Sequence, residues 1–324
     1  MADILIYALH HEGTFNKNSL GAITEGARLA AETGGQAHAV VVGQEIPDAL
    51  AATLGDYGAA KVFKAEGPEG LAQPVVDVMA QVMEENGVQY ALFGGGLVGF
   101  EAGAGLAARL RAGVTMEVTG VIVEDGKLIA QRPILGDSAI SQSRYRDKGI
   151  IVGRLNAFEA KTSGGSAEVV AVEAEPSPQA ARAVIVSRGE QRGADVDIEG
   201  AGTLVAGGRG LGNADGFGLL EELARAFGGN TAVAATRAVV DAGWYPYAGQ
   251  IGQTGKTVAP KLYLAAGISG AIQHKVGMQS SENIVAINKD ANAPIFEFSD
   301  LGVVGDLNKI LPKLTEAIAA KRGA

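Results

Sequence analysis

The stretch KLYLAAGISGAIQHKVGM, residues 261–278, joins an apolar run to a glycine-rich turn and a helical segment. The run LYLAA and the later run IVAIN (284–288) have the continuous apolar character of buried strands in a parallel sheet. The turn between them carries Ser269 and His274, although the chain has only four histidines in 324 residues. Polar side chains that follow a buried strand at the start of a helix usually face a ligand. The stretch therefore predicts a strand–turn–helix unit with a binding site at the turn.

Strands and helices alternate along both halves of the chain, which is the pattern of parallel sheets with helices on their faces. In the first half, four short apolar runs are separated by helical patterns that end at or near glycines: DILIYAL, AHAVVVG, KVFKA and YALFGGG. A hairpin with Asp125-Gly126 at its turn follows them. The segment Glu173–Arg182, EAEPSPQAAR, has the composition of a linker. The alternation then starts again at TLVAGG.

We therefore predict an α/β protein of two domains, residues 1–180 and 181–324, each a largely parallel sheet with flanking helices. The length of 324 residues suits two domains of ~100–200 residues each. The C-terminal domain is expected to be doubly wound, and ligands of such sheets bind beyond the carboxyl ends of the strands.

Composition excludes several classes of function. The net charge of −9 argues against a nucleic-acid partner, because phosphate binding needs a surplus of Lys and Arg. The chain has no cysteine, which excludes disulfides, thiolate metal sites and cysteine nucleophiles, and its histidines lack zinc-like spacing. No apolar run approaches the ~20 residues of a membrane span, and the first residues lack the basic region of a signal peptide. We expect a cytoplasmic protein without membrane insertion.

The unusual polar residues of the second half lie just past the predicted strands. Arg209 stands in the glycine-rich loop LVAGGRGLGN, where the backbone can approach an anion and the guanidinium adds a planar donor. Thr236 and Arg237 end another strand, and Gln253 and Thr254 share a polar loop. Each has an ordinary explanation alone, such as a surface ion pair or a solvated loop. Their gathering at strand ends of one domain favours a ligand site.

Taken together, these motifs resemble the alpha subunit of electron transfer flavoprotein, most strongly from about residue 204 to residue 314. The resemblance lies in GGRG, ATRAVVDAG, GQTGKTVAPKLYLAAGISGAIQHKVGM, IVAINKD and APIFEFSDLGVVGDL. It implies FAD on the C-terminal domain and a heterodimer with a beta subunit, whose fold the N-terminal domain resembles. It also implies an electron carrier without substrate turnover of its own. Its donors would be flavin dehydrogenases, such as the acyl-CoA dehydrogenases of fatty acid oxidation, and its acceptor a quinone oxidoreductase or another protein.

The same resemblance, motif by motif, implies a set of cofactor contacts. Arg237, Thr254 and His274 would surround the isoalloxazine, where Arg237 favours negative charge on the reduced ring at any pH and His274 only when protonated. The turn at Ser269 would meet the pyrophosphate. The full set is Arg209, Thr236, Arg237, Ile251, Gly252, Gln253, Thr254, Ser269, Gly270, Ala271, Ile272, Gln273, His274, Asn288, Asp306 and Leu307, of which the last three would serve the adenosine end.

Two alternatives stay open at the level of sequence. One is a doubly wound NAD-dependent oxidoreductase, which would need His274 as its acid or base. The other is an adenine-nucleotide-binding sensor, in which the segment GGGLVGFEAG (94–103) approaches phosphates. The sequence names neither the electron donor nor the acceptor. It also does not decide whether the beta subunit holds AMP or a second FAD, and hence whether the complex bifurcates electrons.

Overall fold

A computed structural model describes residues 2–11, 13–135, 138–186 and 198–323 of the chain. The chain divides into two compact units, residues 1–188 and 189–324, and each contains a parallel sheet with flanking helices, which confirms the predicted fold class. The boundary that we placed between residues 180 and 181 stays a prediction. Within the described ranges, no helix is both long enough and apolar enough to cross a bilayer.

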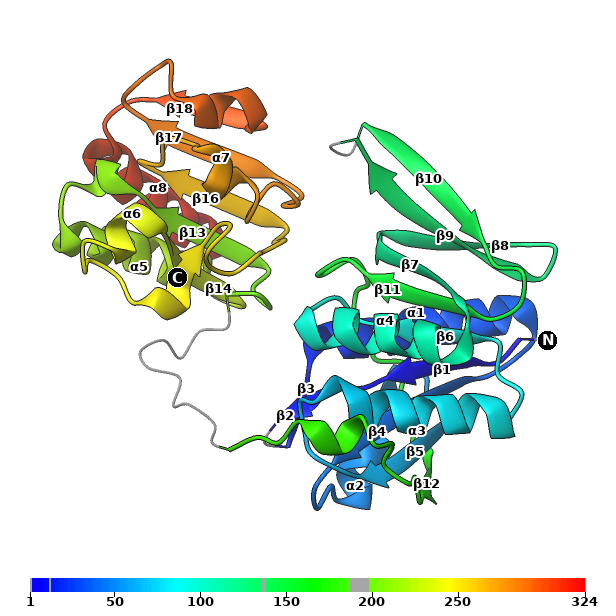
Figure 1. The fold of residues 1–324 in the computed structure, drawn as a ribbon. Helices are drawn as coiled ribbons and strands as arrows, with labels where there is room; N and C mark the ends of the chain where they lie inside the picture. Colours follow the sequence, from blue (N-terminus) through cyan, green and yellow to red (C-terminus); the bar gives the residue numbers. More distant parts are fainter. Residues whose placement is uncertain (1, 12, 136–137, 187–197, 324) are drawn as a thin grey trace. The chain divides into compact units, whose positions relative to one another are not determined.

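The first unit is built on a seven-stranded parallel sheet with the order β12-β5-β4-β1-β6-β11-β7 (Figure 1). Alternate residues of β1 point to opposite faces, as the pleat of a strand requires. Ile4 and Ile6 pack in the core beneath α1, and Leu5 and Tyr7 pack beneath α3 and α4. The strands are β1 (Ile4–Tyr7), β4 (Ala37–Gly43), β5 (Lys61–Glu66), β6 (Tyr90–Phe93), β7 (Gly113–Val118), β11 (Gly149–Gly153) and β12 (Glu168–Val172).

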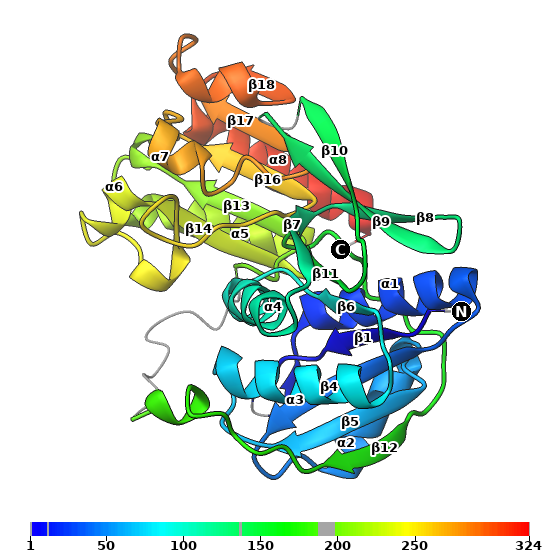
Figure 2. The same cartoon turned by 45° about the vertical axis from the view of Figure 1, so that its right-hand side comes forward.

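Helices cover both faces of this sheet. One face carries α1 (Lys17–Thr33), and the other carries α3 (Ala72–Glu85) and α4 (Leu97–Leu110), which pack against each other (Figure 2). The helix α2 (Asp48–Ala52) and the two-stranded ribbon of β2 (His10–His11) and β3 (Thr14–Phe15) are smaller additions.

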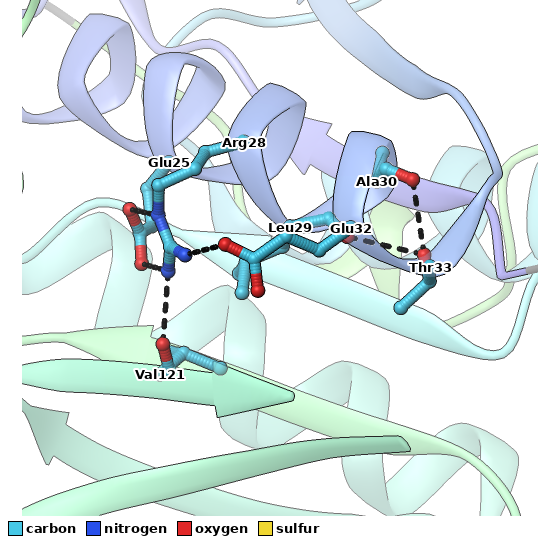
Figure 3. Close-up of polar contacts among 7 residues, drawn as sticks. All are labelled: Glu25, Arg28, Leu29, Ala30, Glu32, Thr33 and Val121. Carbon is cyan, nitrogen blue, oxygen red and sulfur yellow. Dashed lines mark hydrogen bonds and ion pairs between the residues drawn. The ribbon is translucent and has the colours of Figure 1, made fainter. Parts of the chain in front are cut away.

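The predicted hairpin forms part of an antiparallel sheet of β8 (Gly120–Glu124), β9 (Lys127–Ile134) and β10 (Ala139–Arg144). Asp125 and Gly126 both have positive φ, at 51° and 71°, as the predicted two-residue turn needs. Arg28 of α1 ties this sheet to the unit, because its guanidinium pairs with Glu25 and Glu32 and donates to the carbonyl of Val121 at 2.9 Å (Figure 3).

The segment Glu173–Arg182 is not the weakly restrained linker that its composition indicated. The backbone N–H of Ser177 donates to Oδ2 of Asp77 at 2.8 Å, and Arg109 donates to the other oxygen of this buried carboxylate at 3.2 Å. A buried carboxylate needs donors. The segment supplies one and is thereby held against α3, and a short 3₁₀ turn, Ala180–Arg182, packs on that helix.

Gly94 and Gly95, the first two glycines of segment 94–103, are in close contact with other parts of the chain. A Cβ on Gly94 would lie 2.5 Å from the backbone of Asn18, and one on Gly95 would lie 2.4 Å from the backbone nitrogen of Leu155. These glycines let three chain segments meet at the carboxyl ends of β1, β6 and β11. The small size of Gly94 and Gly95 therefore serves packing.

The second unit is a six-stranded parallel sheet with the order β15-β14-β13-β16-β17-β18. The chain enters at the centre with β13, moves outward to β15, and then returns to the centre at β16 before moving outward on the other side. This is the predicted doubly wound topology, and its direction reverses between β13 and β16. The strands are β13 (Thr203–Gly207), β14 (Thr231–Thr236), β15 (Gln250–Ile251), β16 (Leu262–Ala266), β17 (Ile284–Asn288) and β18 (Leu301–Val304).

One face of this sheet is covered by α5 (Phe217–Phe227) and α8 (Leu307–Arg322), which pack side by side. The other face is covered by residues of the loop after β15, by Met278 beyond the short helix α7 (Ile272–Lys275), and by the 3₁₀ turn η6 (Pro294–Phe298). Another short helix, α6 (Arg237–Val240), follows β14 directly. Both faces are thus closed, and the carboxyl edge of the strands is left for a site.

Candidate functional site

A cavity of about 660 Å³ lies at the carboxyl ends of β13, β14, β16 and β17 in the second unit. Its size is within the range of ~300–1,000 Å³ that is usual for small-molecule and cofactor sites. Most of the residues predicted from the sequence line it, although they come from five separate segments. They are Arg209, Thr236, Arg237, Ile251, Gly252, Gln253, Thr254, Ser269, Ala271, Gln273, His274 and Asn288.

The base of the cavity is formed by two glycine-rich turns in backbone contact. The N–H of Gly208 donates to the carbonyl of Ala266, and the N–H of Gly210 donates to the carbonyl of Gly267, both at 3.0 Å. Gly267 has φ of +65°, and a Cβ there would lie 2.7 Å from Cα of Gly210. No other residue type fits between the turns. A surface of bare backbone at this place can be approached closely by a phosphate.

Two arginines reach the cavity from neighbouring strand ends. Arg209 lies between the glycines of the turn after β13, and its side chain forms no ion pair with the part of the chain that the structure describes. Arg237 is the first residue of α6, and its Nε lies 3.2 Å from Oδ2 of Asp241, one helical turn later. The Arg237 side chain is 65% exposed and Asp241 also lines the cavity, so the two form a solvated pair at the rim.

The loop after β15 forms a second wall and is bound to α7. The N–H of Gln253 donates to the carbonyl of Gln273 at 2.8 Å. Gly252 has φ of +131°, and a Cβ there would lie 2.8 Å from the same carbonyl. The close contact fixes the loop that carries Thr254 against the helix that carries His274.

His274 is buried and electrically neutral near pH 7. Its Nε2 lies 2.8 Å from Oη of Tyr263, which is completely buried in β16. Burial lowers the pKa of His274 to about 4, although the adjacent backbone of Ile251 acts in the opposite direction. Nδ1 has no hydrogen-bond partner of good geometry among the described residues. The imidazole therefore carries no positive charge of its own near pH 7, and the roles of His274 and Arg237 beside a flavin ring stay predictions.

The turn after β16 is held by its neighbours β17 and η6. The side-chain amide of Asn288 donates to the carbonyl of Ile268 at 2.9 Å, and its oxygen accepts from the N–H of Asp290 at 3.0 Å. The carbonyl of Ser269 accepts from the N–H of Ile295 at 2.9 Å, while the Ser269 side chain is exposed to the cavity. These bonds fix the backbone and leave the Ser269 hydroxyl available.

The remaining predicted residues do not line the cavity. Gly270 packs on the backbone of Ile295, and Ile272 faces solvent from α7. Asp306 caps α8 by accepting from the N–H of Asn308 at 3.0 Å, and Leu307, the first residue of α8, is buried in the core. Cofactor contact by these four residues stays a prediction.

The sequence analysis missed several residues of the cavity. Most are glycines or apolar residues, whose side chains carry no polar group that would mark a binding site in the sequence. Asp241 could have been found from its i,i+4 spacing to Arg237, and Asp290 from the motif NKD that follows β17. The missed residues are Gly208, Gly210, Ala238, Asp241, Gly267, Ile268, Asp290, Ala293 and Pro294.

Comparison with known proteins gives two family matches that cover most of the chain. Residues 4–177 match the electron transfer flavoprotein domain, and residues 197–279 match the electron transfer flavoprotein FAD-binding domain. The chain is 42% identical to electron transfer flavoprotein subunit alpha of Mycobacterium leprae over 100% of both chains. It is 37% identical to the protein of that name from Bacillus subtilis, over 97% of this chain and 96% of the relative. It is also 34% identical to acryloyl-CoA reductase electron transfer subunit beta of Anaerotignum propionicum, over 99% and 97%.

The contact between the two glycine turns can be tested by Gly267→Ala. We expect a loss of more than ~2 kcal/mol of unfolding free energy, because alanine adds left-handed strain and a backbone clash. Gly218→Ala in α5 is the matched control, since a Cβ there meets nothing within 4 Å and should stabilise the helix by roughly 0.5 kcal/mol. Urea unfolding measures both, and equal stability of Gly267→Ala and the wild type would contradict the packing argument.

The depressed pKa of His274 predicts that acid destabilises the fold. Below about pH 6.5 the unfolded chain protonates this histidine, whereas the folded chain does so only near pH 4. The stability that His274 contributes is thus complete above pH 6.5 and falls by about 3 kcal/mol as the pH drops to 4. Guanidinium unfolding at pH 7 and pH 4.5 should show a smaller loss for His274→Gln than for the wild type. The same loss in both would show that His274 titrates normally.

Proposed function

The chain belongs to the electron transfer flavoprotein family, and we propose that it is the alpha subunit of a heterodimer whose FAD occupies the cavity between β13 and β16. FAD is the cofactor of the family domain that matches residues 197–279. The observation that carries the proposal is the position of the cavity, which lies at the point where the strand order reverses and within this FAD-binding unit. Dinucleotides bind at this point in doubly wound sheets.

The chemical groups around the cavity fit the parts of FAD. The bare glycine turns and Arg209 suit a pyrophosphate, because glycines let an anion approach the backbone closely and the guanidinium adds a planar cation. Arg237, Thr254 and His274 would surround the ring, and Asn288 would lie toward the adenosine. The bound flavin supplies the redox chemistry, and the protein supplies binding, orientation and electrostatics.

Arg237 has the clearest electrostatic role in this proposal. Its charge is permanent, and it would stabilise the negative charge that the ring system gains on reduction. Asp241 holds the guanidinium at the rim and offsets part of its field. His274 adds a neutral polar edge, because its burial keeps the imidazole uncharged near pH 7.

The partners follow from the family. We propose a beta subunit as the permanent partner, flavin dehydrogenases such as those of fatty acid oxidation as donors, and a quinone oxidoreductase or another protein as acceptor. The chain would then act in the cytoplasm as a carrier that turns over no substrate of its own. The buried pairing of His274 with Tyr263 supports a carrier over a hydride-transfer enzyme, since that enzyme would need His274 as an accessible acid or base.

The visible spectrum of the purified complex tests the proposal. The chain co-expressed with its beta subunit should be yellow, with flavin bands equimolar to the chain and FAD as the nucleotide that denaturation releases. Reduction by a flavin dehydrogenase and reoxidation by an acceptor should follow. A folded but colourless complex that fails to take up added FAD would overturn it.

Arg237→Ala should lower the reduction potential of the bound flavin and leave the flavin bound. The guanidinium is largely exposed, so we expect an effect on the order of 1 kcal/mol per electron. Arg237→Lys should lie between, because it keeps the charge and loses the planar fork. Arg225→Ala is the control, since Arg225 carries the same charge in the last turn of α5. Stepwise reductive titration measures the potential in all three variants. An unchanged potential in Arg237→Ala would show that Arg237 has no electrostatic effect on the flavin.

A further inference from the structure

Gln250 is a buried polar residue that lies beside the cavity without lining it. Its side chain is 2% exposed and comes from β15, the short edge strand that precedes the loop of residues 251–254. Its Nε2 donates to two oxygens of Thr254, the backbone carbonyl at 3.1 Å and the hydroxyl Oγ1 at 3.2 Å. Thr254 lines the cavity, so Gln250 can act on a ligand only through Thr254.

The carbonyl of Thr254 fixes the orientation of the Gln250 amide. A carbonyl oxygen only accepts, so the NH₂ group of Gln250 and not its oxygen must face Thr254. The opposite orientation would bring two acceptors together. The hydroxyl of Tyr247 donates to the same carbonyl at 2.9 Å, which holds the peptide in place from a second side.

This orientation decides whether the Thr254 hydroxyl acts as a hydrogen-bond donor or as an acceptor toward the cavity. Because Oγ1 accepts from Gln250, the hydroxyl proton must point away from Gln250. The three side-chain hydrogen bonds that reach Thr254 all end on its oxygens, so its hydroxyl is left as a donor. Since Thr254 lies on the cavity wall, that donor is available to an acceptor inside.

The loop is closed in a way that keeps Thr254 in position. The carbonyl of Gln250 accepts from the N–H of Lys256 at 2.8 Å, and the N–H of Gly252 donates back to the carbonyl of Lys256 at 3.1 Å. A further bond joins Gly255 to Gly252 at 2.9 Å. Gln250 therefore restrains the loop twice, because its backbone carbonyl binds the N–H of Lys256 and its side-chain amide binds Thr254.

We propose that Gln250 is a positioning residue that fixes the Thr254 hydroxyl as a hydrogen-bond donor to the flavin. The inference rests on the proposed function, because it requires FAD in this cavity. The flavin ring carries carbonyl oxygens and unprotonated nitrogens, which are acceptors. A donor aimed at such an atom binds more strongly when the atom gains negative charge on reduction. Gln250 thus acts on both the affinity for FAD and the reduction potential.

The test uses the flavin-loaded complex with the beta subunit and compares Gln250→Met, Thr254→Val and the double variant. Methionine keeps the length of the side chain and removes both donors, and valine removes the hydroxyl. Each single change should raise the Kd for FAD by about tenfold, the effect of one lost hydrogen bond, and should lower the reduction potential. In the double variant, Gln250→Met should add nothing to Thr254→Val, because its effect passes through the hydroxyl.

Two further variants separate polarity from loop support. Tyr247→Phe removes a bond to the Thr254 carbonyl and leaves the hydroxyl untouched, so it should keep the reduction potential even if it lowers the Tm. Gln250→Glu places a carboxylate where the donor was. The carboxylate would accept a hydrogen bond from the Thr254 hydroxyl and weaken the binding of FAD at least as much as Gln250→Met does. The Gln250→Glu variant also keeps the proposal testable if the methionine variant does not fold.

The inference and the proposed function fail in different ways. If Gln250→Met and Gln250→Glu keep the wild-type Kd and potential, or if their effects add fully to that of Thr254→Val, Gln250 is only a structural residue of the loop. Both of those outcomes leave the wild-type complex yellow and the proposed function intact. A wild-type complex that binds no FAD would overturn the proposed function and this inference together.

Discussion

The second unit depends on one contact, the passage of the turn after β13 against the turn after β16. The two backbones touch because residues 208, 210 and 267 are glycines, and two N–H groups bind carbonyls across the gap. The cavity lies beside these two turns, at the reversal of the strand order. The position of every other site residue follows from which strand end it occupies relative to this contact.

Around that contact the site separates charge from hydrogen bonding. The cations Arg209 and Arg237 are exposed to solvent, so their charges carry little desolvation cost and a charged ligand can reach them. Each neutral group on the wall binds a buried partner: His274 binds Tyr263, and Thr254, itself exposed, binds Gln250. Pairs of this kind fix the orientation of the groups on the cavity wall before any ligand arrives, which removes an ordering cost from binding.

The two units show that a glycine-rich turn after a strand is not in itself a binding site. In the first unit, Gly94 and Gly95 follow β6 and are covered by the backbones of Asn18 and Leu155. In the second unit, Gly208 and Gly210 follow β13 and meet only the facing turn, so that a cavity remains beside them. The local sequences are alike. The difference lies in the segments that follow the neighbouring strands, which cover the glycines in the first unit and leave a cavity beside them in the second.

The sequence by itself determined the alternation of strands and helices and the doubly wound second half, because periodicity is a local signal, and the resemblance of its motifs to a known family supplied most of the cavity residues. It did not determine that His274 is uncharged or that Glu173–Arg182 is anchored on Asp77. Those properties arise where segments far apart in the chain meet. Burial beside Tyr263 sets the ionisation of His274, and a buried carboxylate recruits Ser177 from 100 residues away. Only the tertiary structure brings these desolvated groups together, and desolvation is what makes their pairing decisive.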